Sequence, residues 1–459
     1  ESIQVIWALS KVLTAENQEV SYQYRGWNDR LMSSKVSVKD LPLLSRYFDG
    51  LKYWETDEEF TRAFYTAWNL ELKCKAKREQ AQFSGNGGGR YYGSQLKSLT
   101  PITPYWFLKA FHMGLISWDI LCKAVMEYFY RTTSLNAITR LVKGDYAKIG
   151  SYSLWRDFFG EELARSVEQG DPELLGESSW CRKLIQELYD RIVPVIVDTE
   201  LRRGEAETPF SSYIVGIAYI SGCEYLIRIL MALGKDPLGR RTYYSWYYSA
   251  SNTKQEVLSR LLKVCYPREG EDGNTLKAAL ESTSIKKERL VEVAMYAPQW
   301  IDLIQEYLGW TGLKSGCYYF MAHMNERFDD QKKAMIAKYT PLNAEELQDG
   351  AFDVEWFEEA YGLLGEKNFG ILYKAAKYIS DGQKHSRARK YADAATGKVT
   401  LKELRQEIEA KRNKDLLMSY GLVPFEKDRE RDMLERYQFI QQYLKESRQF
   451  GAQRRASEG

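Results

Sequence analysis

The chain has 459 residues, of which 44% are hydrophobic and 28% charged, the balance of a folded protein rather than a disordered one. Its 65 Lys and Arg nearly cancel its 63 Asp and Glu, so no net field attracts it to nucleic acid or to an anionic membrane. The longest apolar run, 192–197, is far shorter than the roughly 20 residues of a membrane-spanning helix. We therefore expect no membrane partner and no general affinity for nucleic acid.

The length predicts two or three cooperative units, or a repeat array, because single cores stop growing at roughly 250 to 300 residues. The cysteines lie far apart in the sequence, and no two form the close pair typical of zinc or redox motifs. They are Cys74, Cys122, Cys181, Cys223, Cys265 and Cys317. We interpret them as buried thiols in a reducing, cytoplasmic environment. Because a helical pattern already begins at Ile6 and the last stretch has no helix stop signal before its final Gly, we expect a piece of a longer polypeptide.

Apolar residues at spacings of three and four recur along most of the chain, as in helices with one face towards a core. In chain order the stripes are Trp118, Leu121, Val125 and Phe129; Leu184, Leu188, Ile192 and Val195; Leu226, Ile229, Leu230 and Leu233; Trp300, Ile304 and Leu308; Trp356, Ala360 and Leu363; Leu372, Ala376 and Ile379; and Met433, Tyr437, Ile440 and Leu444. Strand-like patterns are rare. The best candidate strand is 213–220, where β-branched and aromatic residues cluster around Gly216.

Helix starts are predicted at Pro104, whose missing N–H would have no partner in a first turn, and after the capping residues Ser117 and Asn343. Breaks are predicted at 84–93, 170–178, 204–211, 267–274 and 396–400. We expect an all-α fold of irregular stacked helical hairpins, either a HEAT- or armadillo-like α-solenoid or a multi-helix array. Its expected segments are 1–93, which ends in a Gly-rich connector, 94–274, and 275–459, which is truncated at its end.

A glycine run and a histidine–glutamate pair each suggest a ligand site, but both lack residues that such a site requires. The glycine run 85–90 could approach a phosphate, but it lacks the Lys-Ser/Thr of a P-loop and follows a charged helical stretch, so we interpret it as a connector. His323 and Glu326 would share a helix face, yet further metal ligands are missing nearby. We expect no cofactor, no metal and no catalytic residue that a motif identifies.

The densest polar motif is 381–390, in which Asp381 precedes His385 by four residues and Arg387 and Arg389 follow. In an enzyme this would be a base oriented by an acid beside an anion clamp. The other interpretation is a solvated helix face with Asp381 as its cap. Both remain open at this stage.

Other candidate interaction residues lie in three places. Arg202 and Arg203 end an apolar helix, where they complement exposed carbonyl groups or recognise an acidic peptide or phosphate. The aromatic run 243–248 suits an interface or packs between helices. Its candidate residues are Tyr243, Tyr244, Trp246 and Tyr247. The basic C-terminal stretch, with Arg448, Arg454 and Arg455, is a charge-laced surface helix or an arm that touches phosphates.

Four segments resemble the MolR-like family, large bacterial proteins that carry a domain of unknown function. They are DTELRRG at 198–204, ILMALGK at 229–235, AAKYISDG at 375–382 and LKESRQFGAQRR at 444–455. The resemblance runs from about residue 185 to the C-terminus. It implies a very long cytosolic protein, a link to molybdate-dependent regulation, and partners such as ring ATPases of the MoxR type and von Willebrand type A proteins. It supplies no catalytic residues.

These patterns favour a helical scaffold that binds other proteins, since stacked hairpins form extended surfaces without catalytic groups. An enzyme with a polar site at 381–390 is the first alternative, and a nucleic-acid-binding regulator is the second.

Overall fold

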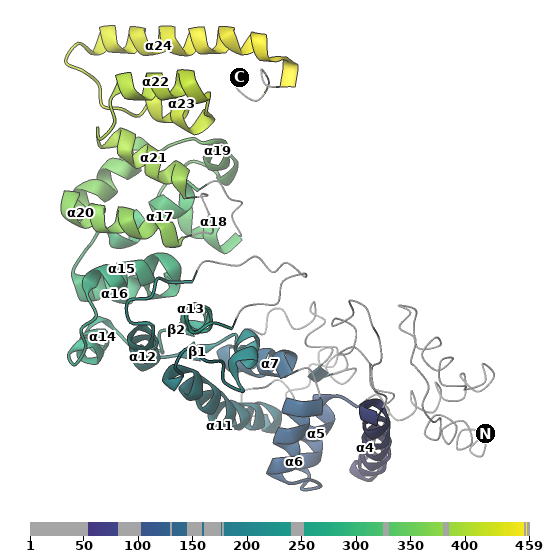
Figure 1. Ribbon diagram of the computed structural model, residues 1–459. Coiled ribbons are helices and arrows are strands. Elements are labelled where there is room, and N and C mark those ends of the chain that lie inside the picture. Colours follow the sequence, from purple (N-terminus) through teal and green to yellow (C-terminus); the bar gives the residue numbers. More distant parts are fainter. Residues whose placement is uncertain are drawn as a thin grey trace. The chain divides into compact units, whose positions relative to one another are not determined.

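The structure is a computed structural model whose described residues are 54–80, 102–128, 131–144, 158–159, 176, 179–239, 252–324, 330–379, 385–453 and 456. Their regular structure is almost entirely helical, which confirms the predicted all-α class (Figure 1). The chain divides into two compact units. Unit 1 is Glu1–Val197 with Tyr213–Tyr219, and unit 2 is Asp198–Ser212 with Ile220–Gly459.

The three expected segments stay a prediction. The boundary after residue 93 lies outside the described residues, and the one after residue 274 falls in the first turn of helix α14 (Gly273–Leu280).

Unit 1 is built around an aromatic core. Its helices are α4 (Asp57–Gln80), α5 (Pro104–His112), α6 (Trp118–Lys123), the π-helix η2 (Ala124–Tyr128), α7 (Arg131–Lys143) and the first part of α11 (Trp180–Arg202). Phe64 of α4 meets Phe107 of α5 edge to face, with ring centroids 5.4 Å apart. Both rings are fully buried, so this contact fixes how the two helices pack.

The predicted helix starts in the described residues are confirmed. Helix α5 begins at Pro104. Ser117 accepts a hydrogen bond from the Ile120 N–H at the start of α6. Asn343 forms a capping box with Glu346 at the start of α19 (Ala344–Asp349).

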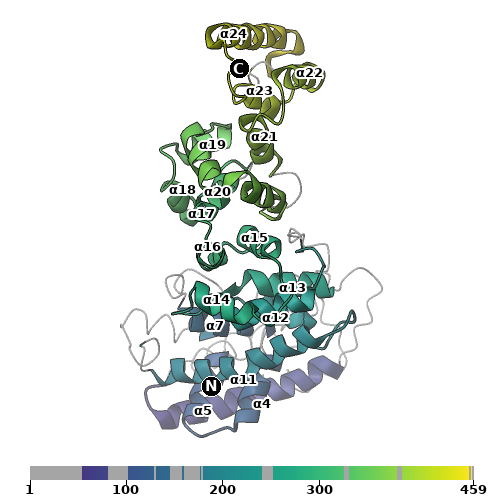
Figure 2. The same ribbon diagram turned by 90° about the vertical axis from the view of Figure 1, so that its left-hand side faces the viewer.

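Unit 2 contains the rest of the helices. They are α12 (Cys223–Leu233), α13 (Lys254–Lys263), α14, α15 (Lys287–Tyr296), α16 (Ile301–Leu308), α17 (Leu313–Ala322), α18 (Asp330–Ile336), α19, α20 (Val354–Ala375), α21 (Ser386–Ala395), α22 (Leu401–Lys411), α23 (Lys414–Tyr420) and α24 (Arg429–Glu446), with short 3₁₀ helices η5 (Pro298–Trp300), η6 (Ala376–Tyr378) and η7 (Ser447–Phe450). Contacts join elements that are close in sequence: α12 packs on α13 and α14, α14 on α16, α15 on α16 and α20, α17 on α20 and α21, and α23 on α21 and α22. Unit 2 is therefore a helical array whose members follow chain order (Figure 2).

The expected strand at 213–220 is wrong for most of its length. Residues Ser211–Gly216 form the 3₁₀ helix η4. Only Ile220 belongs to a strand, β1 (Ile220–Ser221), which pairs in parallel with β2 (Cys265–Tyr266). Strand propensity depends on the packing around a segment. Here only two residue pairs form a strand ladder, and most of 213–220 packs in other conformations. No helix in the described ranges combines the length and the apolar character needed to cross a membrane.

Helices α17 and α20 approach each other closely at a glycine. A Cβ atom on Gly316 would lie 2.6 Å from Leu372 Cδ2 and 2.9 Å from Leu364 Cδ1. Because both leucines are buried, neither can move aside easily. The absence of a side chain at Gly316 therefore sets the spacing between the two helices.

We predict that Gly316→Ala destabilises unit 2 by about 1–3 kcal/mol, because the added methyl group overpacks this contact. The control is Gly362→Ala in α20, where a Cβ atom would meet nothing within 4 Å and the gain in helix propensity should stabilise by ~0.5–1 kcal/mol. Urea denaturation followed by circular dichroism measures both changes. Equal stability of the two variants would contradict the close approach.

Candidate functional site

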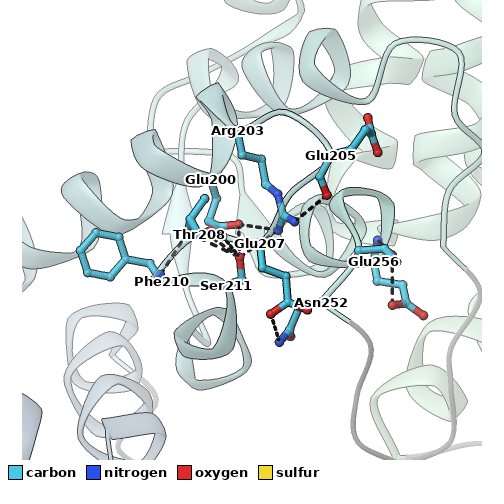
Figure 3. Close-up of polar contacts among 10 residues, drawn as sticks. Glu200, Arg203, Glu205, Glu207, Thr208, Phe210, Ser211, Asn252 and Glu256 are labelled. Atoms are coloured by element: carbon cyan, nitrogen blue, oxygen red, sulfur yellow. Dashed lines mark hydrogen bonds and ion pairs between the residues drawn. The ribbon is translucent and has the colours of Figure 1, made fainter.

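The two arginines that close helix α11 have different roles. The side chain of Arg202 is 79% exposed and lies 3.9 Å from Asp198. The side chain of Arg203 is only 1% exposed, and its Nη1 donates to Glu200 Oε2 and to Ser211 Oγ, each at 2.9 Å (Figure 3). Arg203 is thus held inside unit 2, and of this predicted pair only Arg202 is available at the surface.

Two hydroxyl groups complete this buried cluster. Ser211 Oγ lies 3.1 Å from both carboxylate oxygens of Glu200, and Thr208 Oγ1 donates to the same carboxylate. The Thr208 N–H in turn donates to Ser211 Oγ at 2.9 Å. Thr208 and Ser211 were not identified from the sequence, because no local pattern shows that the loop containing them folds back onto the end of α11. The cluster holds 203–211 against the end of α11 (Figure 3), and its hydroxyl and carboxylate groups bind one another and the Arg203 Nη1.

We predict that Arg203→Ala destabilises the protein by roughly 3–5 kcal/mol, because it leaves the Glu200 carboxylate buried without its cation. The neighbouring Arg202→Ala is the matched control and should change stability by less than about 1 kcal/mol, as expected for an exposed pair. Chemical denaturation of both variants measures the difference. If both variants lost the same free energy of unfolding, the buried ion pair would contribute no more to stability than the exposed one.

The polar motif at 385–390 lies in unit 2, and its described side chains contact several neighbouring helices. Arg387 Nε donates to Asp415 Oδ1 at 2.9 Å, and its Nη1 donates to the Gln348 carbonyl oxygen at 2.7 Å. This side chain is 6% exposed and joins α21 to α23 and α19. Arg387 is therefore a structural link between three helices.

Lys390 lies beside the same carboxylate, with its Nζ 3.9 Å from Asp415 Oδ2, whereas the other members of the motif have different surroundings. The Arg389 guanidinium lies over the ring of Tyr373, 4.3 Å from its centroid. His385 is buried just before α21, and Asp381 lies outside the described residues. The described part of the motif thus connects helices. Across the described ranges, no group of three His, Cys, Asp or Glu residues is placed to hold a metal ion.

A second buried polar group, His323, lies at the end of α17 among aromatic rings. The rings within reach are Tyr319, Phe352, Trp356 and Tyr391, with centroids 4.6, 5.1, 5.9 and 6.1 Å from the imidazole. His323 Nδ1 lies 2.8 Å from the Tyr319 carbonyl oxygen. Since a carbonyl only accepts, Nδ1 carries the proton. His323 Nε2 is buried and has no hydrogen-bond partner among the described residues.

This environment keeps the imidazole neutral. Burial lowers the pKa of His323 to about 4, from an ordinary value of 6.5. The hydrogen bond to Tyr319 and the charge of Asp353 oppose the shift, while the charge of Arg387 adds to it. A proton on Nε2 would place an unpaired positive charge inside the aromatic cluster.

We predict that His323 makes the stability of unit 2 depend on pH between about 6.5 and 4. The unfolded chain binds a proton at His323 below pH 6.5 and the folded chain only near pH 4, so the stabilisation is complete above 6.5 and lost as pH falls. The loss due to this group is about 3 kcal/mol.

The measurement is urea denaturation at several pH values for the wild type and for His323→Phe, which removes the titrating group and keeps a ring. The difference between the two pH profiles isolates His323 from the carboxylates common to both. Parallel profiles would contradict the assignment.

The first half of the last long helix, α24, does not bury the face that its sequence predicts. Met433 and Tyr437 are 52% and 61% exposed, and Leu434 is 55% exposed. The buried face instead contains the ion pair of Asp432 and Arg436, 2.7 Å apart. The expectation that the stripe beginning at Met433 faces the core is wrong for Met433 and Tyr437, whereas Ile440 and Leu444 are partly buried and Leu444 packs against a core cluster.

The reason lies in the loop before α24. Arg436 Nη1 donates to the carbonyl oxygens of Tyr420 at 3.3 Å and Val423 at 2.7 Å, and Nη2 donates to that of Pro424 at 3.2 Å. Asp432 accepts from the Glu426 N–H at 2.9 Å. These backbone groups need partners, so the polar side of the first half of α24 turns inward and three large apolar side chains turn outward, while Phe439 and Tyr443 are buried further along the helix.

Several candidates cannot be placed. Tyr243, Tyr244, Trp246, Tyr247, Arg454, Arg455 and the glycine run 85–90 lie outside the described residues. Arg448 is exposed in η7.

Comparison with known proteins gives a family without an assigned activity. The model of a family described as Family of unknown function (DUF5724) matches residues 2–459, so the chain belongs to this family. No curated protein matches the chain. No solved structure matches it either. The family match does not bear on the resemblance to MolR-like proteins, which stays a prediction.

Proposed function

We propose that this member of the DUF5724 family is a helical scaffold that binds other proteins. The observation that carries the proposal is the inverted polarity of the first half of α24, which buries Asp432 and Arg436 and exposes Met433, Leu434 and Tyr437. Exposed apolar side chains gathered on one face are typical of interaction sites, and Met and Tyr are enriched in protein interfaces.

The occupant that fits this face is a helix of a partner protein. Met433 and Tyr437 are four residues apart, and Ile440 follows after three. This spacing forms the narrow seam along which two helices pack side by side. The flanking charges Arg431 and Glu435 already pair with each other at 3.0 Å, so apolar packing would supply most of the affinity.

The resemblance to MolR-like proteins suggests the first partners to test. Ring ATPases of the MoxR type and von Willebrand type A proteins are the candidates. A regulatory role within a large cytosolic protein belongs to the same proposal. The residues at 385–390 do not favour the enzyme alternative, because Arg387 and Arg389 contact different helices.

We predict that a photo-crosslinking amino acid at position 437 gives discrete adducts in the native host. Leu434→Ser should reduce their yield about fivefold, because it removes a large exposed apolar side chain that flanks the seam of Met433 and Tyr437. The control position is Glu409 on α22, which is exposed and paired with Arg405.

Mass spectrometry identifies each adduct. The proposal requires that the same protein is captured at positions 433 and 437, in a yield that depends on Leu434. Equal capture at positions 437 and 409, or no dependence on Leu434, would count against it.

A further inference from the structure

A second surface in unit 2 carries an unbalanced charge. Residues 339–366 contain eight acidic side chains and no Lys, Arg or His, in a chain whose net charge is +2. The acids are Glu345, Glu346, Asp349, Asp353, Glu355, Glu358, Glu359 and Glu366. The stretch covers α19 and the first half of α20. Its local negative potential is therefore not visible in the overall composition.

Three of these acids lie on the exposed face of α20. Glu355, Glu358 and Glu359 are exposed and follow the i, i+3, i+4 spacing that places side chains on one side of a helix. Two apolar residues, Val354 and Leu363, flank this face and are 46% and 50% exposed. Leu363 was expected in the core, but Leu364 is buried in its place.

The other side of the same helix is firmly packed. Trp356 is 3% exposed, and its Nε1–H donates to Ser315 Oγ at 2.8 Å. Phe357, Ala360 and Leu364 are also buried. Because one side of α20 is anchored, the glutamate face cannot rotate into the array and remains a surface.

Some exposed glutamates elsewhere in unit 2 have a cationic partner on their own helix. Glu407 pairs with Lys411 at 2.9 Å, and Glu409 and Glu435 pair with Arg405 and Arg431. In contrast, none of the three glutamates in the first half of α20 forms an ion pair with a described residue. Like charges three or four residues apart repel one another on a helix. A cationic partner would remove this repulsion.

The backbone provides room beside the charges. Gly362 lies on the same face, and a Cβ atom there would meet nothing within 4 Å. Three residues later, Gly365 has φ 69° and ψ 160°, so the helical path breaks at this point. The missing side chain at Gly362 leaves space beside Leu363 for an apolar side chain of a partner.

We propose that the exposed face of residues 354–364 binds a basic amphipathic helix of a partner protein, with Lys and Arg side chains arranged around an apolar anchor. The cations pair with Glu355, Glu358 and Glu359, and the anchor rests on Leu363 over Gly362. This inference rests on the proposed scaffold function and adds to it the chemical class of one partner. It uses a surface separate from the apolar face of α24.

The test uses the full chain and a synthetic peptide of about 18 residues that forms a helix, with Lys and Arg around one Leu on a single face. Fluorescence anisotropy measures its Kd. Changing Glu355, Glu358 and Glu359 together to Gln should raise the Kd at least about tenfold, and Leu363→Ser several-fold, because charge and anchor both contribute. The wild-type affinity should fall as salt rises from about 0.05 to about 0.3 M.

Matched controls separate this site from general attraction. Changing Glu407, Glu409 and Glu435 together to Gln removes the same charge elsewhere in unit 2 and should change the Kd less than about twofold. A peptide of the same composition with its Leu and cations scrambled around the helix should bind more weakly.

The inference would be overturned if the two triple variants changed the Kd equally, if the scrambled peptide bound as tightly as the original, or if the wild type did not bind the peptide at low salt. It would also be overturned if sedimentation experiments showed self-association of the chain that the α20 triple variant abolishes. That result would make a second copy of the chain the occupant. Because crosslinking at position 437 reports on α24, Leu434-dependent adducts without peptide binding would reject this inference alone. If the Leu434-dependent adducts are absent and the peptide does not bind either, the scaffold function itself is rejected.

Discussion

A guanidinium group that leaves water must find a carboxylate and further oxygen atoms for its five N–H donors, and this requirement shapes unit 2. Arg203 meets it through its Nη atoms alone, with Glu200, Ser211 and the Glu205 carbonyl. Arg387 meets it with Asp415 and the Gln348 carbonyl, and Arg436 with Asp432 and backbone carbonyls of 420–424. In each case the arginine joins segments that the helical ladder does not connect. The connections between helices are thereby held by charged side chains as well as by apolar packing.

These arginine links decide which surfaces remain for partners. A helix that turns a charged pair inward turns part of its apolar stripe outward, as α24 does with Met433 and Tyr437. Helix α20 shows the opposite arrangement, since an aromatic side is buried and an acidic side is exposed. One array therefore presents two chemically different faces, which suits a protein that holds more than one partner.

The buried imidazole of His323 has one nitrogen without a hydrogen-bond partner among the described residues. Its Nδ1–H is satisfied by the Tyr319 carbonyl, while Nε2 faces rings that offer it no donor. An aromatic cluster tolerates a neutral imidazole much better than a charged one. Unit 2 thus contains a group whose protonation opposes the packing of α17 against its neighbours, whereas its arginines stabilise the array only because they are charged and paired.

The sequence by itself determined the helical class, and it also placed helix starts such as Pro104 and Asn343, because turn spacing and capping depend on residues only a few positions apart. It also placed the buried stripe of α12, whose Leu226, Ile229, Leu230 and Leu233 are all buried. It did not determine which face of α24 is buried in the first half of that helix. Asp432 and Arg436 compete with Met433 and Tyr437 for the interior of α24, and the carbonyls of 420–424, which come together only on folding, decide that competition. The same holds for Arg203 and Arg387, candidate binding residues from their local pattern that the tertiary structure makes internal links, since the partners of a buried charge lie on other elements.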